Sequence, residues 1–242
     1  GGDWHDGGAW ELGVPVAGQH VAVTQSVDSL TLTNETASLA SFTMTGGTLT
    51  FSNWTTRLRA DAVHIAGGVL TLPPAFKSTE MSNRVWIVCS NLTLAAQGAI
   101  DVTGKGYASE HGPGVGNTVL KDSGAGGGYG GRGGRSRHFL TGGNPYGSVT
   151  APDAPGSGGG KSKSYAGGGH GGGAVRIDAA GTVMLNGTIS ANGVSSAHTY
   201  SGGGSGGGIH LSCLAFGGTN GLIRANGGAS GSSATASGGS GG

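Results

Sequence analysis

The sequence has little charge, few cysteines and no long apolar run. Charged residues make up 10% of its 242 residues and the formal net charge is +1, whereas an ordinary soluble domain carries about 25% charged residues. Without a charge excess, long-range attraction to nucleic acid or to an anionic membrane is not expected. Two cysteines do not make a disulfide framework, and no stretch approaches the roughly 18 apolar residues that span a bilayer. We therefore expect no nucleic-acid partner and no membrane-spanning segment.

What the chain has instead is glycine. Glycine supplies 56 of the 242 residues, several times the usual level of about 7%. Glycine and β-branched residues are both less stable than alanine in a helix interior. The composition therefore predicts strands and extended segments in place of helices. Because the sequence begins Gly-Gly-Asp-Trp, with neither an initiator methionine nor a signal peptide, we expect a processed or excised fragment.

Three 20-residue windows align without a gap and indicate a repeat. They are VWIVCSNLTLAAQGAIDVTG at 85–104, AVRIDAAGTVMLNGTISANG at 174–193 and GIHLSCLAFGGTNGLIRANG at 208–227. Apolar residues alternate with polar ones in each window, which is the period of a strand with one buried face. The matching columns predict a shared core made of Trp86, Val88, Ile100, Val175, Ile177, Ile189, Ile209, Leu211 and Ile223.

An earlier pair of segments repeats at a spacing of 21 residues, FTMTGGTLTF at 42–51 and VHIAGGVLTL at 63–72. A further shift of 22 reaches the window at 85, so we expect the two sets to form one series. Short strands that recur every 20–22 residues, with glycine pairs at the corners, predict the coils of a parallel β-solenoid (β-helix). A β-sandwich with regular hairpins is the alternative.

The N-terminal part also carries a longer pattern. Residues 10–72 read W-x-x-GVP-x-x-G-x-x-V-x-V, followed by alternating strands and S-F-T-M-T-GG-T-L-T-F. This resembles the glycine-eight module, a β-helical domain of extracellular and cell-surface proteins, and the start of many bacterial surface β-helix proteins. The resemblance implies a right-handed parallel β-helix on a secreted protein and carries over no catalytic residue. The residues that support it are Trp10, Pro15, Gly18, Val21, Val23, Leu39, Phe42, Gly46, Gly47, Leu49 and Phe51.

Beyond residue 105 that likeness ends and glycine tracts take over. Two of them, 166–173 and 201–208, run directly into a predicted strand, and this fixed placement favours ordered packing. An ordered tract can adopt the threefold, extended polyglycine II helix, whose bare backbone can bond to neighbours on every side. By composition the arrangement resembles the polyglycine II layers of phage tail adhesins and of snow-flea antifreeze protein. Flexible glycine-serine linkers are the alternative. The tracts are 124–134, 156–160, 166–173, 201–208 and 237–242.

No group of residues points to catalysis, a cofactor or a metal. The glycine tracts lack the aspartates of calcium-binding repeats, and no two of the eight histidines stand at a zinc-ligand spacing. The 12 acidic residues are dispersed, which disfavours a polysaccharide lyase, and threonine ladders for ice binding are fragmentary. GGYGGRGGRSR at 127–137 resembles an arginine-glycine RNA-binding box, but a solvated loop or a subunit contact suits a nearly neutral chain better.

Two kinds of side chain carry covalent predictions. The repeat alignment turns Cys213 toward the core and Cys89 away from it, so no disulfide between them is expected. If the chain passes through a eukaryotic secretory pathway, four N-x-[ST] sequons are candidate N-glycosylation sites on its outer face. They begin at Asn34, Asn53, Asn91 and Asn186.

Together these patterns predict an all-β, parallel β-solenoid with ordered glycine-rich segments. We expect a glycine-eight-like part at 1–104, a glycine-rich insertion at 105–173 and further repeats at 174–242, continued by another coil or by a neighbouring molecule. The expected role is a secreted, self-assembling structural subunit of an extracellular filament, appendage or surface layer, and not an enzyme. The alternative is a cell-surface adhesin that binds carbohydrate or a receptor through 105–173. The rings available there for stacking on sugars are Tyr107, Tyr129, Phe139, Tyr146 and Tyr165.

Overall fold

The computed structural model describes residues 2–24, 29–118, 123–136, 141–162 and 167–231. Within these ranges the chain has one 3₁₀ turn, η1 (Gly7–Ala9), no α-helix, and one 13-stranded sheet in which every pairing is parallel. The prediction of an all-β chain with parallel strands is confirmed. The strands are β1 (Gly2–Asp3), β2 (His20–Val23), β3 (Leu30–Leu32), β4 (Leu39–Met44), β5 (Thr48–Phe51), β6 (Leu58–Thr71), β7 (Arg84–Asp101), β8 (Ala174–Ala179), β9 (Thr182–Leu185), β10 (Thr188–Ser190), β11 (Ile209–Ser212), β12 (Ala215–Gly217) and β13 (Leu222–Arg224).

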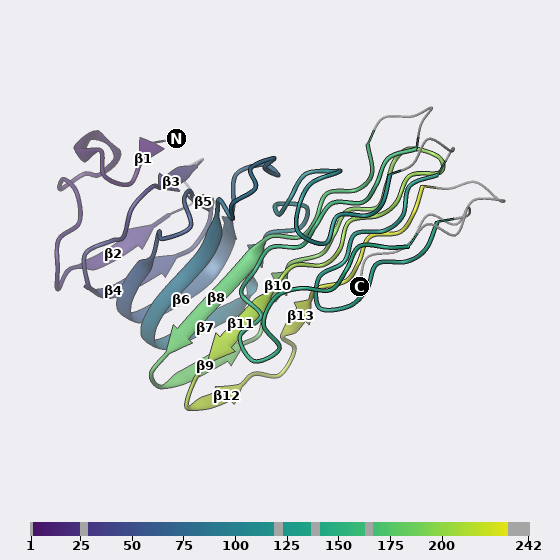
Figure 1. Ribbon diagram of the computed structural model, residues 1–242. Coiled ribbons are helices and arrows are strands. Elements are labelled where there is room, and N and C mark those ends of the chain that lie inside the picture. The colour runs from purple at the N-terminus through teal and green to yellow at the C-terminus, as the bar shows by residue number, and fades with distance from the viewer. Residues whose placement is uncertain (1, 25–28, 119–122, 137–140, 163–166, 232–242) are drawn as a thin grey trace.

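The long strands β6 and β7 hold the sheet together (Figure 1). The main path runs β1-β3-β5-β6-β7-β10-β13, while β2 pairs with β4 and β4 with β6. On its other side β7 pairs with β8, β9 and β10, which pair in turn with β11, β12 and β13. The glycine-rich segments lie beyond the ends of these strands as a bundle of extended lines (Figure 1). The chain therefore consists of two connected parts, a layered sheet and a glycine bundle.

Apolar side chains stack in columns across the parallel strands. One column runs from Leu49 in β5 through Leu70 and Ile100 to Ile189 in β10, and each of these side chains is fully buried. Because pairing in register places like residues on top of one another, each layer covers the apolar row of the layer before it. Burying one such side chain stabilises the fold by about 1.5–3 kcal/mol, so the columns are the main source of stability in the sheet.

The pair of segments spaced by 21 residues in the sequence pairs as its spacing indicates. Phe42 lies opposite Val63 and Leu49 lies opposite Leu70. The expected continuation to residue 85 is wrong, because Val63 lies opposite Leu92. Strand β7 begins at Arg84, well before that contact, after a connection at 72–83 that adds residues to this layer. The two sets therefore join with a longer step than the repeat predicts.

Two of the predicted core residues lie on the outer face instead. Trp86 pairs with Arg176, and Val88 pairs with Asp178, so both side chains point away from the core, where Val85 and Ile87 are fully buried. The reason lies in the turns. The turn at 180–182 has one residue more than the matching 90–91 of β7, and the turn at 186–187 has two fewer than 95–98. An alignment without gaps therefore fits Ile100 but is displaced by one residue at Trp86.

The other predicted core residues divide by layer. Ile100, Val175, Ile177 and Ile189 are fully buried. In the last layer Ile209 and Leu211 are partly buried against the core, and Ile223 is 45% exposed. The register pairs these residues as predicted, Ile209 with Val175, Leu211 with Ile177 and Ile223 with Ile189. The three residues of the last layer are more exposed than their partners because no described segment covers the outer side of β11 and β13.

A tryptophan closes the opposite end of the core. Trp4 follows β1, is only 1% exposed, and packs against Phe42 with 5.9 Å between ring centroids. Trp10 meets it edge to face at 4.7 Å, and the Trp10 Nε1–H donates a hydrogen bond of 2.7 Å to the Trp4 carbonyl. A buried tryptophan adds a large apolar area. The N-terminal end of the sheet is thus capped by its own chain.

Candidate assembly site

The glycine bundle has a fully buried central segment. All eight residues from Ser201 to Gly208 are buried, although this segment has only two side chains, both serine. Its neighbours come from other tracts of the chain, at 124–128, 154–160, 168–173, 191–194 and 225–228. A tract that packs on all sides cannot be an exposed linker. Among the described residues, the interpretation of tract 201–208 as a flexible linker is therefore disfavoured.

Backbone hydrogen bonds connect the central segment to its neighbours with a period of three residues. Every third N–H, beginning at Gly202, donates to tract 154–160, and the N–H groups at Gly204 and Gly207 donate to tract 191–194. Carbonyl groups of the same segment accept from three further tracts. The donor pairs are Gly202 to Gly160 (2.9 Å), Ser205 to Ser157 (2.9 Å), Gly208 to Ala154 (2.8 Å), Gly204 to Val194 (3.1 Å) and Gly207 to Ala191 (2.8 Å).

The close packing explains why these positions are glycine. A Cβ built on Gly202, Gly204 or Gly207 would meet a backbone carbonyl of another tract at well under 3.0 Å. Backbone cannot move aside as the end of a flexible side chain can, so any side chain would force tracts apart. Gly130 is different, because a Cβ there meets nothing within 4 Å. The bundle therefore contains both required and replaceable glycines.

Serine hydroxyls fill the bundle where a side chain fits. Ser205 Oγ accepts the N–H of Ser157 at 2.8 Å and donates to the Gly128 carbonyl at 3.2 Å. Ser157 Oγ accepts the N–H of Gly114 at 2.9 Å and donates to the Tyr146 hydroxyl at 3.0 Å. Both serines are fully buried. Because buried backbone groups must find partners, these hydroxyls add side-chain hydrogen bonds to the direct backbone bonds between the same tracts.

The described tyrosines that the adhesin alternative would use for sugars pack inside the chain. Tyr107 is 1% exposed and packs on Phe76 at 4.6 Å between ring centroids. Tyr129 is buried and meets half-buried Tyr146 edge to face at 5.1 Å, and the Tyr146 hydroxyl also donates to the Pro155 carbonyl. The remaining two predicted rings, Phe139 and Tyr165, lie outside the described residues. Each of the three described tyrosine rings therefore packs against another ring of the chain.

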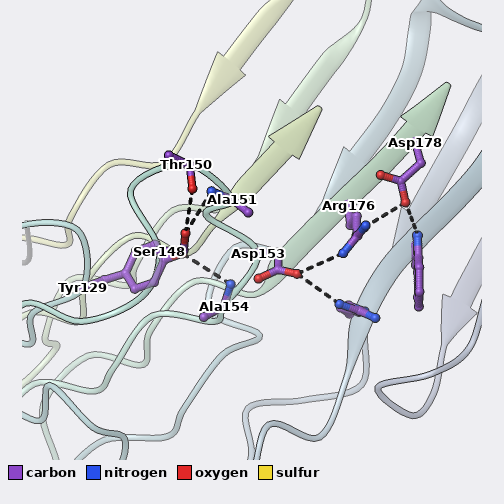
Figure 2. Close-up of polar contacts among 10 residues, drawn as sticks. Tyr129, Ser148, Thr150, Ala151, Asp153, Ala154, Arg176 and Asp178 are labelled. Atoms are coloured by element: carbon purple, nitrogen blue, oxygen red, sulfur yellow. Dashed lines mark hydrogen bonds and ion pairs between the residues drawn. The ribbon is translucent and has the colours of Figure 1, made fainter. Parts of the chain in front are cut away.

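A charged junction fastens the bundle to the outer face of the sheet (Figure 2). Asp153, from the loop before tract 156–160, accepts from Nη1 of Arg84 at 3.2 Å and of Arg176 at 3.4 Å. Arg176 Nε and Trp86 Nε1 both donate to Asp178 at 2.8 Å. The Arg84 guanidinium lies over the Trp86 ring at 3.9 Å, a cation–π contact, and its side chain is 8% exposed. One carboxylate thus joins β7 and β8 to the bundle.

The loop that carries Asp153 is shaped by short-range hydrogen bonds (Figure 2). Ser148 Oγ accepts from the Ala151 N–H at 3.1 Å and lies 3.3 Å from the Thr150 hydroxyl. The N–H of Ala154 donates to the buried Tyr129 hydroxyl at 3.3 Å. These bonds hold the loop on both sides of Asp153. The carboxylate therefore meets the arginines from a fixed backbone.

Burial and charge oppose each other in this junction. Desolvation lowers the pKa of Arg84, and the nearby Asp153 carboxylate partly offsets this effect. Desolvation also raises the pKa of Asp178, but hydrogen bonds from Arg176 and Trp86 outweigh it and bring the pKa below the ordinary value of 3.8. Asp178 is therefore ionised at neutral pH. The guanidinium groups of Arg57, Arg84 and Arg176 lie 4.6, 3.9 and 4.9 Å from the centre of the Trp86 ring.

The last layer of the sheet is open on one side. Strands β11, β12 and β13 each pair with one described strand, β8, β9 and β10 respectively. Apolar side chains stand exposed there, among them Leu214 at 86% and Phe216 at 56%. Such an edge offers backbone groups and apolar surface to a further strand. This layer, β11–β13 with the turns between them, is called the open end below.

The four predicted glycosylation sites differ in their surroundings. Asn34, Asn53 and Asn91 are exposed, and Asn186 is half-buried. Asn53 Nδ2 donates to the Thr33 carbonyl at 2.8 Å, while the Oδ1 atoms of Asn91 and Asn186 accept backbone N–H groups of the next layer at 2.9 Å. Within the described residues, Asn34 alone of the four has a side chain without such a bond. It is the sequon most open to modification.

Both cysteines are free thiols. The expectation that Cys89 points outward is wrong, because it is buried between Ala60 and Ala179 in the stacked strands, and Cys213 is half-buried at the open end. The same displaced alignment that misplaces Trp86 misplaces Cys89. Desolvation raises the pKa of Cys89 to about 11, so the thiolate is scarce at neutral pH and the side chain acts as a small apolar residue.

Within the described ranges, no three or more histidine, cysteine, aspartate or glutamate side chains come together as a metal site would require. No helix in that part of the chain is long and apolar enough to cross a membrane. Comparisons with family models, with curated proteins and with solved structures find no match to the chain. Function is therefore inferred from the sheet, the bundle, the junction and the open end.

Sequence reasoning missed the junction and the N-terminal cap. Arg176 and Asp178 alternate with the buried residues of β8, which places both on its outer face, and that alternation is a signal available in the sequence. Asp153 gives no such signal, because it lies in a loop 69 positions from Arg84. Trp4 precedes the pattern of strands and gives only its size as a hint.

Proposed function

We propose that this chain is a rigid structural segment of an extracellular assembly. In this proposal the sheet is a parallel β-solenoid and the glycine tracts are polyglycine II helices packed beside it. The observation that carries the proposal is the central segment 201–208, which is buried on all sides and bonded every third residue to neighbouring tracts. A period of three residues is that of the polyproline II class of helix.

The solenoid part of the proposal rests on the columns of the sheet. Parallel strands that return to the same column after each circuit, such as Leu49, Leu70, Ile100 and Ile189, are typical of stacked coils. Each coil covers the apolar row of its neighbour, so bending the stack would separate backbone bonds and core together. Such a stack suits a role in which stiffness matters more than binding a small molecule.

The bundle adds cross-links between distant parts of the chain. Hydrogen bonds join tract 201–208 to residues as far away in sequence as Gly127, whose N–H donates to the Gly203 carbonyl at 2.9 Å. Local opening must break several of these bonds at once, and proteases cut chains that open. Exposed, flexible segments are preferred sites of cleavage, so burial of the tracts and of the residues that border them suits exposure to extracellular proteases. The exposed sequons Asn34, Asn53 and Asn91 are compatible with a secreted chain.

The inward-facing tyrosines support the structural role over the adhesin. Tyr107, Tyr129 and Tyr146 pack within the bundle, so a carbohydrate surface built on them would require the bundle to come apart. Trp86 is likewise covered by three arginine side chains. These four rings therefore support packing within the chain, which favours a structural role over sugar binding.

Immuno-electron microscopy of the native material tests the proposal. Antibodies against the chain are expected to label regular structures outside the cell, and the purified chain is expected to resist thermolysin at concentrations that degrade its Gly204→Ala variant. Gly130→Ala is the matched control and is expected to resist like the parent. Diffuse labelling inside the cell, or cleavage of the parent as rapid as that of the Gly204→Ala variant, would refute the proposal.

A further inference from the structure

The open end has the features of an inner layer that has not been covered. Phe216 continues the column of Val183, and Ile223 continues that of Ile189. Val183 and Ile189 are fully buried because β12 and β13 lie above them, whereas Phe216 and Ile223 are 56% and 45% exposed. The last layer therefore leaves the ends of two apolar columns uncovered, at Phe216 and Ile223. An apolar residue from one further strand would cover each of them.

Asparagine side chains connect each layer to the next at defined atoms. Asn186 Oδ1 accepts the N–H of Thr219 at 2.9 Å, and Asn192 Oδ1 accepts the N–H of Asn226 at 2.9 Å, 34 positions along the chain. The sequence repeats this pair, because N-G-T-I-S-A-N-G at 186–193 returns as N-G-L-I-R-A-N-G at 220–227. Asn220 and Asn226 are exposed, and neither side chain has a hydrogen-bond partner among the described residues.

The side-chain oxygens of Asn220 and Asn226 determine the direction in which an added strand can pair. A chain laid parallel on the open end, one repeat further on, brings backbone N–H groups to Asn220 and Asn226 as Thr219 and Asn226 are brought to Asn186 and Asn192. An antiparallel strand reverses the order of its N–H groups and misses this match. The same end of a second copy, related by a two-fold axis, would arrive antiparallel. It is therefore the wrong partner.

The N-terminal end of a second copy also fits poorly. Its core is closed by Trp4 and Trp10, and its outermost strands are β1, of two residues, and β2, of four. In the described chain it offers no counterpart to β11 and no glycine tract to continue 225–228. Head-to-tail stacking of this chain would leave β11 and tract 225–228 without a matching partner.

We infer that the open end takes up one further coil of the same 34-residue repeat, laid in parallel register on β11–β13 with its backbone N–H groups on Asn220 and Asn226. The stack thus extends from the open end. This inference rests on the proposed structural role and specifies its partner. The coil presents alternating apolar residues to Phe216 and Ile223 and a glycine tract to 225–228.

The test extends the chain by one repeat. The sequence of residues 175–208 is appended directly after Gly242, which keeps the 34-residue period, and a scrambled version of the same 34 residues is the control. Urea denaturation is expected to give a higher midpoint and a higher m-value for the true extension, because m scales with the surface buried on folding. The scrambled extension is expected to match the parent in both quantities.

Two point variants locate the effect. Phe216→Lys places a charge on the open end and is expected to abolish the gain in midpoint from the extension, compared with Phe216→Lys alone. Leu12→Lys, at a residue 96% exposed near the other end, is expected to leave the gain intact. A true extension that behaves like the scrambled one overturns the inference. So does a parent chain that forms a stable dimer lost in Phe216→Lys, because a second copy would then be the partner.

These outcomes are separate from failure of the structural role itself. If Gly204→Ala leaves stability and protease resistance unchanged, the proposed bundle is wrong whatever the open end binds. If Gly204→Ala is destabilising but the extension adds nothing, the bundle stands and only the inference about the open end falls.

Discussion

Replacing one glycine in the bundle provides the sharpest test of its packing, and Gly204→Ala is the most informative change. A Cβ at Gly204 meets the carbonyl of His170 and its backbone neighbours, all from another tract. Overpacking of this kind costs about 1–3 kcal/mol. Displacing the tract also weakens the bonds from Gly204 N–H to Val194 (3.1 Å) and from Gly228 N–H to Gly204 (2.8 Å), each contributing about 0.5–1.5 kcal/mol.

An opposing effect comes from the unfolded chain. Glycine to alanine restricts the unfolded state and stabilises a protein by about 0.4–1 kcal/mol where the fold accepts alanine. At Gly204 the clash is larger, so the net result is a loss of about 2–4 kcal/mol in the free energy of unfolding. At Gly130 nothing lies within 4 Å of the new Cβ and the backbone has no positive φ. Gly130→Ala is therefore expected to be neutral or slightly stabilising.

Urea denaturation followed by circular dichroism measures both variants, with the midpoint compared at constant m-value. The same glycine-to-alanine change is thus predicted to lower the free energy of unfolding at Gly204 and to leave it unchanged or slightly raise it at Gly130. Equal midpoints for Gly204→Ala and Gly130→Ala would mean that the tracts do not pack closely in solution, and the reasoning from carbonyl contacts would fail.

Three further predictions concern the junction and the cap. Asp153→Asn is expected to lower the free energy of unfolding by about 1–3 kcal/mol, because it leaves the buried Arg84 without its carboxylate. Exposed Asp61→Asn is the control, and equal denaturation midpoints for the two variants would contradict a stabilising role of the charged junction. Because the pKa of Asp178 is lowered, its stabilisation is complete above 3.8 and lost as the pH falls through the folded value; the acid loss of stability is expected to be shallower in Asp178→Asn, and identical curves would exclude this group as its source. Trp4→Ala is expected to cost about 3–5 kcal/mol by opening the N-terminal core, and a thermal midpoint within experimental error of the parent would show that Trp4 is no cap.

The sheet could be predicted from the sequence where strand and turn lengths repeat. Phe42 and Leu49 find their predicted partners Val63 and Leu70, because both layers have the same length. Trp86 could not be placed by alignment alone, because turns of unequal length shift the register between β7, β8 and β9. Alternation shows that a strand has two faces, but one inserted residue exchanges them.

The candidate site was less predictable than the sheet, for a different physical reason. The position of tract 201–208 before β11 indicated order, yet composition alone is equally typical of a linker. Some of the contacts that bury it come from residues more than forty positions away, such as the bond between Ser157 and Ser205, which are 48 positions apart. The junction at Asp153 joins Arg84 across 69 positions. Neither contact follows a local period, so only three-dimensional packing defines them.

Sheet and bundle reinforce each other because backbone hydrogen bonds set both the distance between strands and the distance between glycine tracts. Layers of the sheet are separated by the backbone N–H···O=C hydrogen bond, which sets neighbouring strands about 4.8 Å apart. Neighbouring tracts of the bundle are joined by the same bond at 2.7–3.1 Å, so a tract leaving one layer can stay in step with that layer. A side chain on the tract would widen this spacing and break the match. The glycine content is therefore a condition for extending layered order beyond the sheet, where side chains would otherwise end it.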